Sequence, residues 1–290
     1  MTRSVTYTAC GKLNLFLDIV GRREDGYHLL ETVMQSVSVR DRLRFEFSEG
    51  RGIELRCYTP GFPLDGTNLI CKAARRFCER TGATLPGRLT VTVEKNIPSM
   101  AGMGGGSADC AAALIALDEL CGTALAREEL LDIGQSLGAD VPFTMAGGTA
   151  FCQGTGELMT PLTTRRDVWY TAVQPGFRVS TAAAYKACDE AELSGAPRCS
   201  DFIETYKTSP RAAAGRMYNV FERALALPEI AEIKQKMTAL GALGAMLTGS
   251  GSVIFGVFDD PERAQRCADS FSDFGFAKVL TPEVAGICRE

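Results

Sequence analysis

The chain has 290 residues, of which 46% are hydrophobic and 23% are charged, and its formal net charge is −4. These values describe an ordinary globular protein with one large or two ordinary domains, and we expect two domains with a cleft. The acidic balance disfavours a nucleic-acid-binding protein, which normally carries a basic face. No segment has the roughly 18 apolar residues of a membrane span, and residues 1–10 lack a signal-peptide core. We therefore expect a cytoplasmic protein without membrane contact.

Eleven cysteines and a single histidine limit the possible metal chemistry. The number of cysteines is odd, none form a Cys-x-x-Cys pair, and Cys71, Cys78, Cys110 and Cys121 lie in helical patterns. We therefore expect free, mostly buried thiols and no metal site built from protein ligands.

The first predicted strand covers residues 9–20 and alternates polar with apolar side chains. Lys12, Asn14 and Asp18 would share one face, with leucines on the other. An exposed strand lysine is usually a solvated edge charge, but Lys12 stands in a run too apolar for a free edge. Lys12 is therefore a candidate functional residue, with an ordinary surface charge as the alternative.

A polar turn at 21–26 precedes Tyr27 and His28, so the only histidine lies beside a predicted hairpin turn. Proline and glycine predict a loop at 59–66. The remaining patterns of the first half predict strands at 33–47, 53–57 and 89–94 and a helix at 68–80.

A glycine-rich stretch at 97–109 separates the strand at 89–94 from a predicted helix at 108–121. Four of its glycines fall within five positions, and Ser107 is a predicted N-cap. The first N–H groups of a helix lack intrahelical acceptors, and the helix dipole adds partial positive charge there. The stretch therefore predicts a phosphate-binding loop.

Two familiar phosphate motifs do not fit this loop. A P-loop needs Gly-Lys-Ser/Thr at its end, whereas Gly106 is followed by Ser107 and Ala108. A dinucleotide fingerprint would need a third glycine where Ser107 stands. A purely structural glycine turn remains the alternative.

A second unusual segment follows the helix predicted at 127–137. Gly138 is placed as its C-cap, and Pro142 stops further helix, which holds Asp140 in a rigid turn. The Asp140 carboxylate is either a functional group or merely the N-cap of the next short turn.

The rest of the chain is predicted to form a compact α+β unit, with a composition change near residue 160. A glycine-serine turn at 248–252 between two apolar runs gives a second place where backbone can approach a ligand. Residues 194–210 are predicted to be loop-rich. The remaining elements are strands at 147–156, 169–174 and 277–280 and helices at 182–188, 212–226, 229–240 and 261–270.

Taken together, these stretches resemble the GHMP kinase superfamily, named for galactokinase, homoserine kinase, mevalonate kinase and phosphomevalonate kinase. The resemblance covers the whole chain. Four segments are similar to the branch of the superfamily that acts on 4-diphosphocytidyl-2-C-methyl-D-erythritol in the non-mevalonate isoprenoid route. These segments are residues 11–17, 25–28, 102–108 and 137–142.

The resemblance implies an α+β, two-domain GHMP kinase fold with the active site in the interdomain cleft. Residues 1–160 would be the N-terminal ATP-binding and catalytic domain, and residues 161–290 the C-terminal α+β domain. The implied reaction is ATP-dependent phosphorylation of the 2-hydroxyl of this small-molecule substrate. Mg²⁺ is expected with ATP, held mainly by phosphates and water because no acidic pair is evident.

The resemblance also implies catalytic roles. Asp140 matches the aspartate that accepts the substrate hydroxyl proton, and Lys12 matches the lysine that supports this aspartate and the developing charge. The phosphates of ATP would lie against the backbone of the glycine-rich stretch. Its expected ATP-binding residues are Pro98, Ser99, Met100, Ala101, Gly102, Met103, Gly104, Gly105, Gly106, Ser107 and Ala108.

The implied substrate-binding residues are Asn14, Tyr27, His28, Thr181 and Tyr185. Tyr27 and His28 match a cytidine-reading pair, with a stacking ring and a hydrogen-bonding imidazole. Tyr185 falls where a second stacking aromatic is expected, and Thr181 where a nearby polar contact is expected.

Some positions depart from the pattern. Met103 stands where leucine is common, Ala108 replaces a frequent serine, and Tyr185 replaces phenylalanine. Residues 190–215 match no assigned feature.

Three other functions remain to be weighed. Another small-alcohol kinase of the superfamily is disfavoured by the 25–28 motif. A non-catalytic nucleotide-binding protein is disfavoured by the presence of both Lys12 and Asp140, because such a protein needs neither residue. A dinucleotide oxidoreductase is disfavoured by Ser107.

Overall fold

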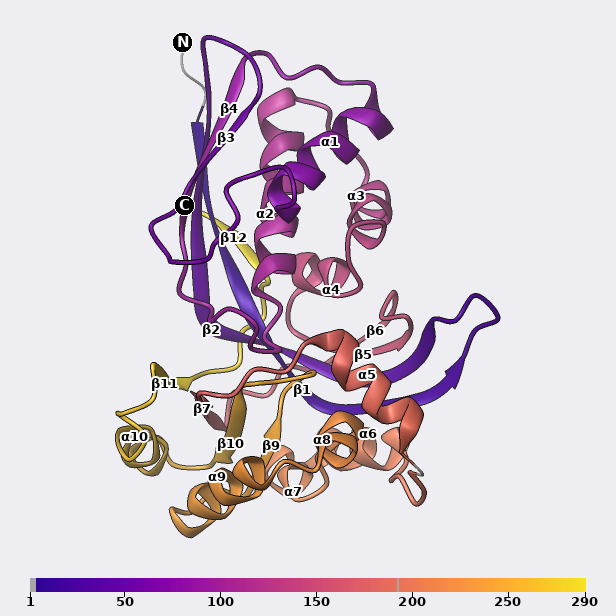
Figure 1. Cartoon of the computed structure of the whole chain (residues 1–290), viewed down its shortest axis with the longest axis vertical. Coiled ribbons are helices and arrows are strands. Elements are labelled where there is room, and N and C mark those ends of the chain that lie inside the picture. Colours follow the sequence, from indigo (N-terminus) through magenta and orange to yellow (C-terminus); the bar gives the residue numbers. More distant parts are fainter. Residues whose placement is uncertain (1–3, 192) are drawn as a thin grey trace.

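The computed structural model describes residues 4–191 and 193–290, and Figure 1 shows the whole chain. A mixed eight-stranded sheet runs from the top of this view past its middle, and its upper half, with four helices on one side, forms the upper part of the molecule. The strands are β1 Ser4–Arg22, β2 His28–Ser48, β3 Ile53–Arg56, β4 Arg88–Glu94, β5 Thr149–Gly154, β6 Leu158–Leu162, β8 Tyr218–Asn219 and β12 Ile287–Arg289. The helices are α1 Leu69–Thr81, α2 Gly105–Cys121, α3 Arg127–Gln135 and α4 Val141–Ala146.

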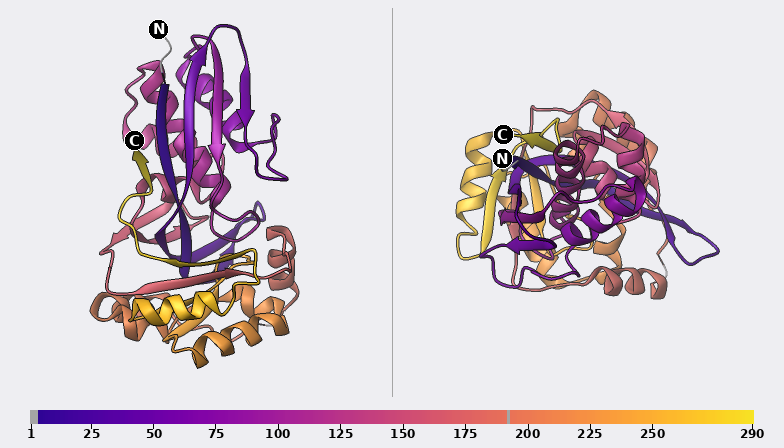
Figure 2. Two further views of the ribbon diagram at one scale, coloured as in Figure 1. Left: turned by 90° about the vertical axis from the view of Figure 1, so that its left-hand side faces the viewer. Right: turned by 90° about the horizontal axis from the view of Figure 1, so that it is seen from above.

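A second, antiparallel sheet with the strand order β11-β7-β10-β9 forms the lower part. Its strands are β7 Trp169–Gln174, β9 Gly244–Leu247, β10 Ile254–Phe258 and β11 Phe276–Leu280. The left view of Figure 2 shows helices below this second sheet. In the same view, the helices of the upper part lie behind the upper sheet. The remaining helices are α5 Thr181–Glu190, α6 Cys199–Thr208, α7 Pro210–Ala214, α8 Val220–Leu225, α9 Pro228–Ala239 and α10 Pro261–Asp269. The two sheets with their helices confirm the predicted α+β class.

Two long, bent strands connect the parts. β2 pairs with β4 through residues 42–48 and with β5 through residues 30–35, so its two ends belong to different regions of the sheet. The β1–β2 pairing shifts register after Cys10, after Asn14 and after Ile19. Such irregularities bend a strand and change where its side chains point. The bends flank Lys12 and Asn14, which therefore lie at the middle of the molecule rather than on a flat sheet face.

The core of the upper part is built around α2. Its alanines are fully buried, because small side chains let the helix pack closely against the sheet and α1. Leu114, Leu117 and Leu120 are also buried there, as the sequence pattern predicts. This helix fixes the position of the glycine-rich stretch that leads into it.

Residues 194–210 form the predicted loop only as far as residue 198, and the rest of the prediction is wrong. Cys199, Phe202 and Tyr206 lie at helical spacing and are buried, so this stretch contains α6 and the start of α7. The helix predicted at 212–226 is also wrong as one element, because the end of α7, the short strand β8 and α8 share those residues. Local turn-forming residues outweighed the apolar spacing in the prediction.

Two predicted helix caps are wrong as well. The N-cap of α2 is Gly104, so Ser107 lies in the first turn of the helix instead of before it. Helix α3 ends at Gln135 with Ser136 as its C-cap, and Gly138 N donates to Gly134 O in the turn that follows. Gly104 takes the cap position of α2 with φ of +72°, which favours glycine, and α3 ends before it reaches Gly138.

All eleven cysteines are free thiols, six of them buried. In the described residues, no helix is long and apolar enough to cross a membrane. The final strand β12 pairs with β1, so the C-terminal end returns to the upper sheet. The predicted boundary near residue 160 stays a prediction.

Candidate active site

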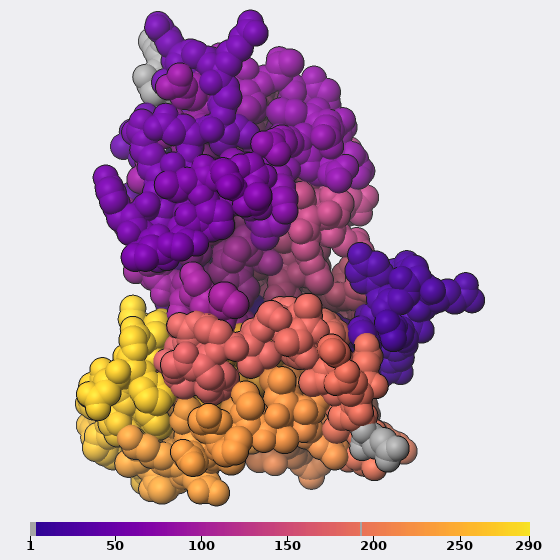
Figure 3. All heavy atoms as spheres, in the orientation of Figure 1, coloured from indigo at the N-terminus to yellow at the C-terminus, as the bar shows by residue number. Residues whose placement is uncertain are grey.

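A cleft of about 700 Å³ lies where the upper and lower parts meet. Its lining comes from β1, the glycine-rich stretch, the start of α4, α5 and the turn at 249–251. Figure 3 shows α5, in salmon, along the line where the two parts meet. Segments far apart in the sequence therefore contribute to one site.

The glycine-rich stretch curls around the cleft before it enters α2. The first backbone hydrogen bond of this helix runs from Ala108 N to Gly104 O, at 2.8 Å. The N–H groups of Gly105, Gly106 and Ser107 precede that bond and are available to a ligand. Because α2 is a long helix, its dipole adds partial positive charge at the same place. The local geometry therefore suits an anionic group.

Close backbone approach explains two of the glycines. Gly102 has φ of +73°, and a Cβ there would lie 2.0 Å from the carbonyl oxygen of Thr248. Gly104 has φ of +72°, and a Cβ there would lie 3.2 Å from Lys12 Cγ and 3.7 Å from Asp140 Oδ2. Only a residue without a side chain fits either position without displacement. The stretch is thus packed against β1 and against the 248–252 turn.

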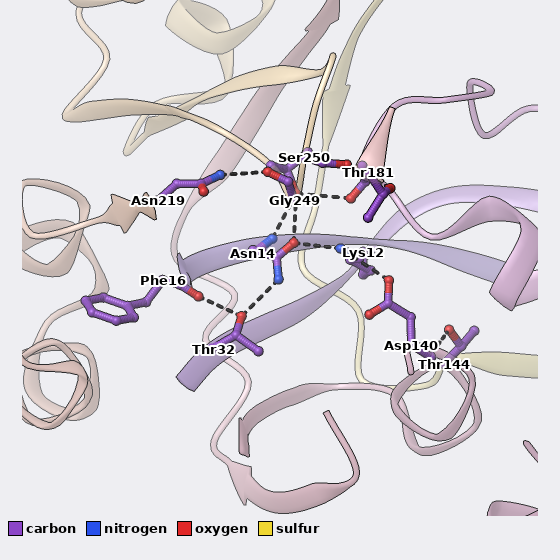
Figure 4. A network of polar contacts seen from close by, with 12 residues as sticks. Lys12, Asn14, Phe16, Thr32, Asp140, Thr144, Thr181, Asn219, Gly249 and Ser250 are labelled. Atoms are coloured by element: carbon purple, nitrogen blue, oxygen red, sulfur yellow. Dashed lines mark hydrogen bonds and ion pairs between the residues drawn. The ribbon is translucent and has the colours of Figure 1, made fainter. Parts of the chain in front are cut away.

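Lys12, Asn14 and Asp140 meet beside Gly104 (Figure 4). Lys12 Nζ donates to Asn14 Oδ1 at 2.6 Å and lies 3.4 Å from Asp140 Oδ2. Lys12 and Asn14 are 5% and 3% exposed, whereas the Asp140 side chain is 31% exposed. The lysine is therefore fixed inside the protein, and the carboxylate reaches into the cleft.

Asp140 occupies the N-cap position of α4, but its side chain caps nothing. Thr144 donates to the Asp140 backbone carbonyl through both its N–H and its hydroxyl, at 3.0 and 2.9 Å. These bonds hold the backbone of Asp140 and leave its carboxylate free to face Lys12 (Figure 4). Asp140 thus has the N-cap position that the alternative predicts, but its carboxylate makes no capping hydrogen bond.

A chain of hydrogen bonds fixes Asn14 between the two parts of the molecule (Figure 4). Asn14 Nδ2 donates to Thr32 Oγ1 at 2.9 Å, and Asn14 N donates to Thr248 Oγ1 at 3.0 Å. Asn219 Nδ2 donates to the carbonyls of Leu247 and Gly249, at 2.7 and 2.9 Å. Buried and fully bonded polar groups of this kind hold a single geometry.

The 248–252 turn also contacts α5. Ser250 and Thr181 share a hydrogen bond of 3.1 Å between their hydroxyls. Ser252 N and Val253 N donate to the carbonyls of Met100 and Ala101, at 3.2 and 3.1 Å. The turn therefore contacts both the glycine-rich stretch and α5. These contacts close one side of the cleft.

Aromatic residues surround the only histidine. The rings of His28 and Tyr185 stack with centroids 4.7 Å apart, and Tyr185 meets Phe221 edge-on at 4.9 Å. Burial raises the pKa of Tyr185 to about 12, so its hydroxyl stays neutral. Tyr27 is 66% exposed and lies near Arg23 instead, 6.0 Å from guanidinium carbon to ring centroid. The structure thus brings His28 and Tyr185 together but leaves Tyr27 outside.

A buried charge cluster lies behind the glycine-rich stretch. Lys95 Nζ contacts the carboxylates of Asp41 and Asp109, the latter at 2.7 Å. Asp41 Oδ1 also accepts from the backbone N–H groups of Asn96 and Ile97, at 2.7 and 2.9 Å. Burial raises the pKa of Asp109, and Lys95 only partly offsets this. For Lys95, burial opposes the charge, but the two carboxylates prevail and raise its pKa. The cluster anchors the start of the stretch.

Most of the predicted site residues line the cleft. From the glycine-rich stretch these are Pro98 to Ser107, while Ala108 is fully buried in the core. Lys12, Asn14, Asp140, Thr181 and Tyr185 line it as well. Tyr27 and His28 lie outside the lining, although His28 packs directly on Tyr185.

Several lining or supporting residues were not predicted. The sequence contains a signal for Lys95 and Asp109, because these charged residues stand beside or within otherwise apolar runs. The sequence contains no such signal for Thr32, Asn219 and Thr248, since their importance depends on contacts between distant segments.

No cluster of three or more His, Cys, Asp or Glu side chains able to hold a metal ion occurs in the described part of the chain. Among the acidic residues of the cleft lining, Asp140 is the one nearest Lys12. It lies beside the glycine-rich stretch that leads into α2. Such an arrangement suits a cation held mainly by phosphates and water.

Comparisons with known proteins agree with this architecture. The family models for the GHMP kinase N-terminal domain and the GHMP kinase C-terminal domain match residues 68–148 and 208–277. A crystal structure of homoserine kinase from Cytophaga hutchinsonii has a TM-score of 0.76 at 18% identity, covering 99% of this chain and 97% of the other. At this identity the likeness shows the fold alone. The fold and the cleft are therefore those of a GHMP kinase.

Two further relatives narrow the class. The 4-diphosphocytidyl-2-C-methyl-D-erythritol kinase of Clostridium botulinum (strain Eklund 17B / Type B) is 38% identical over 268 residues, 91% of this chain and 95% of the relative. A crystal structure of 4-(cytidine 5'-diphospho)-2C-methyl-D-erythritol kinase has a TM-score of 0.80 at 33% identity, covering 97% and 99% of the two chains. The chain belongs to the family of 4-diphosphocytidyl-2-C-methyl-D-erythritol kinases.

Proposed function

We propose that this enzyme transfers the γ-phosphoryl group of ATP to the 2-hydroxyl of 4-diphosphocytidyl-2-C-methyl-D-erythritol, a step in isoprenoid precursor synthesis. One observation carries the proposal: Lys12 and Asp140 lie 3.4 Å apart beside the glycine-rich stretch, within a single cleft. Family membership supports the substrate, through the name that the relatives share. The expected cytoplasmic location and the absence of nucleic-acid binding remain predictions.

In the proposed reaction, the substrate hydroxyl oxygen attacks the γ-phosphorus of ATP. The new O–P bond forms as the bond to the β,γ-bridging oxygen breaks, and ADP leaves. The hydroxyl proton passes to the Asp140 carboxylate, which faces the cleft and is not engaged as a cap. Lys12 supports this carboxylate and the charge that develops on the transferred group. Phosphoryl transfer needs little more from the protein than such positioning and charge stabilisation.

The ATP phosphates would lie against the backbone of residues 98–107, where the open N–H groups at the start of α2 can donate to them. The close packing at Gly102 and Gly104 brings this backbone within reach of Lys12 and Asp140. Mg²⁺ would be coordinated by the phosphates and water, and it would neutralise charge on the phosphates.

The cytidine would be read where Tyr185 lines the cleft and His28 packs on the Tyr185 ring. Tyr185 offers an aromatic face and His28 offers an imidazole, while Thr181 and Asn14 supply polar groups along the path between. Tyr27 lies on the exposed hairpin turn, so it would contact the base only after it moves toward the cleft.

A substrate panel tests the proposal. We expect ADP release with the cytidyl-erythritol substrate, and rates at least about a hundredfold lower with homoserine or mevalonate, because a site built for a polar base rejects ligands without one. Equal or faster turnover with homoserine or mevalonate would replace the proposed function with another small-alcohol kinase activity. Nucleotide binding without turnover of any of the three would favour a non-catalytic protein.

A further inference from the structure

Asp189, on the last turn of α5, holds the only histidine of the chain. The His28 Nε2 atom lies 2.7 Å from Asp189 Oδ1, at hydrogen-bond distance. Arg22 Nη1 lies 3.6 Å from Asp189 Oδ2, and Arg22 is paired with His28 across the β1–β2 hairpin. One carboxylate on α5 therefore contacts both strands of the hairpin.

This contact determines the chemistry of the imidazole. An ionised carboxylate only accepts hydrogen bonds, so His28 Nε2 must carry a proton. The bond from His28 keeps the pKa of Asp189 below its usual range, which favours the ionised carboxylate. In the neutral ring, Nδ1 then has a free lone pair and is an acceptor. Within the described part of the chain, no group donates to Nδ1.

The same helix positions the ring. Tyr185 lies one turn before Asp189 on α5, so both side chains project from one face of the helix. Tyr185 stacks on the His28 ring with an interplanar angle of 24°, and Phe221 supports Tyr185 edge-on. Asp189 fixes the edge of the imidazole while Tyr185 fixes its face. The orientation of His28 is therefore determined from two directions.

We propose that Asp189 is a positioning residue for base recognition, which holds His28 with Nδ1 as an acceptor for the exocyclic amino group of cytosine. Uracil carries a carbonyl oxygen at the corresponding position, which would face the Nδ1 lone pair as a second acceptor. The contact therefore favours a cytidine-linked over a uridine-linked substrate. This inference rests on the proposed function, in which His28 reads the base.

One test observes the ring directly and does not depend on turnover. With a single histidine, ¹⁵N-imidazole labelling gives one unambiguous set of ring signals, and ¹⁵N–¹H correlation identifies the protonated nitrogen. In the neutral ring, we expect the wild-type enzyme to hold the proton on Nε2. Asp189→Ala should give a mixture of both tautomers. A proton on Nδ1 in the wild-type enzyme overturns the inference, whatever the enzyme's substrate.

A kinetic test uses the cytidyl substrate and its uridyl analogue at saturating ATP. Asp189→Ala should raise KM for the cytidyl substrate about tenfold and reduce the preference over the uridyl analogue about tenfold. The KM for ATP and kcat should change less than about twofold. Asp189→Asn keeps an oxygen that can accept from Nε2 and should restore part of the preference. Glu190→Ala is the matched control, because Glu190 is exposed and, among the described residues, its ion pair is with Lys186 on the same helix.

The outcomes separate the inference from the proposed function. A wild-type enzyme that fails to phosphorylate the cytidyl substrate contradicts the proposed function and the base-recognition role together, while the ring signals still report the Asp189–His28 contact. An active wild-type enzyme with unchanged KM and unchanged base preference in Asp189→Ala contradicts the role of Asp189 alone. A proportional loss in kcat with both substrates would make Asp189 a structural residue only.

Discussion

Lys12 and Asp140, the pair proposed for catalysis, and His28 and Tyr185, the pair proposed to read the base, are held in different ways. We call the first pair the catalytic end and the second pair the base end of the proposed site. Lys12 is buried and bonded to Asn14, which is tied by hydrogen bonds to β2 and to the 248–252 turn. The His28 imidazole is held by side chains, through an exposed carboxylate and a stacked ring. Lys12 is therefore held by a buried network, whereas His28 depends on a contact with a partly exposed carboxylate.

This difference matches the separate tasks proposed for the two ends. Proton transfer and charge stabilisation require groups fixed within a few tenths of an ångström, which buried networks provide. Base recognition requires selective contacts that can open to admit a ligand, which a more exposed side-chain cluster allows. We therefore expect changes at the catalytic end to lower kcat, and changes at the base end to raise KM.

The largest effect is expected for Asp140→Asn. The amide has the same shape but cannot accept the substrate proton, so kcat should fall about a thousandfold. ATP affinity should stay within about twofold, because Asp140 lies beside the phosphate-binding backbone rather than forming it. Steady-state ADP release and ATP titration measure the two quantities. Unchanged turnover would exclude Asp140 as the base.

Gly102→Ala should destabilise the junction between the two parts of the cleft. The added Cβ would lie 2.0 Å from the Thr248 carbonyl oxygen, and φ is positive at this residue. We expect the free energy of unfolding to fall by at least about 2 kcal/mol in urea denaturation.

Gly106→Ala is the matched stability control for that change. Its added Cβ would meet only Leu69 Cδ1, at 3.5 Å, and alanine favours the helix that Gly106 belongs to. The free energy of unfolding should stay the same or rise by up to about 1 kcal/mol. If Gly102→Ala were as stable as Gly106→Ala, the close packing against the 248–252 turn would not exist in solution.

His28→Ala should act at the base end. Removal of the imidazole should raise KM for the cytidyl substrate about tenfold, with a much smaller change in KM for ATP. Initial rates at varied concentrations of each substrate provide both constants. Equal increases in both KM values would contradict a base-reading role.

The smallest effect is a pH dependence from the cluster behind the glycine-rich stretch. The pKa of Asp109 is higher in the folded state than in the unfolded state, so the folded chain retains a proton that the unfolded chain loses. This contribution is fully present below the unfolded value near 4 and is lost as pH rises through the folded value.

Asp109→Asn should remove that dependence. Between about pH 5 and pH 9, the free energy of unfolding of the wild-type enzyme should fall relative to that of the variant. Asp132→Asn, at an exposed position on α3, is the control and should follow the wild type. Parallel curves for Asp109→Asn and the wild type would exclude a raised pKa at Asp109.

The catalytic end was the more predictable end from the sequence. The strand, glycine-rich stretch and helix around Gly104 are consecutive in the chain, so their local patterns indicated a phosphate-binding geometry. The register of β1 placed Lys12 and Asn14 on one face by simple alternation. Their meeting with Asp140 came from the family resemblance, because no local pattern relates residues so far apart.

The base end was less predictable. Asp189 and His28 are 161 positions apart, and no local pattern relates a helix-terminal aspartate to a hairpin histidine. Asn219 likewise acts through a turn that is distant in sequence, and its short strand was hidden inside a predicted helix. The prediction also placed Tyr27 with His28, whereas Tyr27 precedes β2 on the exposed hairpin turn and His28 is the first residue of the strand.

The most direct test of the two-ended cleft is to measure kcat and KM for Asp140→Asn and His28→Ala in one assay with the cytidyl substrate. The predicted result is a split, in which Asp140→Asn loses kcat with little change in KM and His28→Ala raises KM with little change in kcat. Loss of the same kinetic parameter in both variants would contradict the division of the cleft into a catalytic end and a base-reading end.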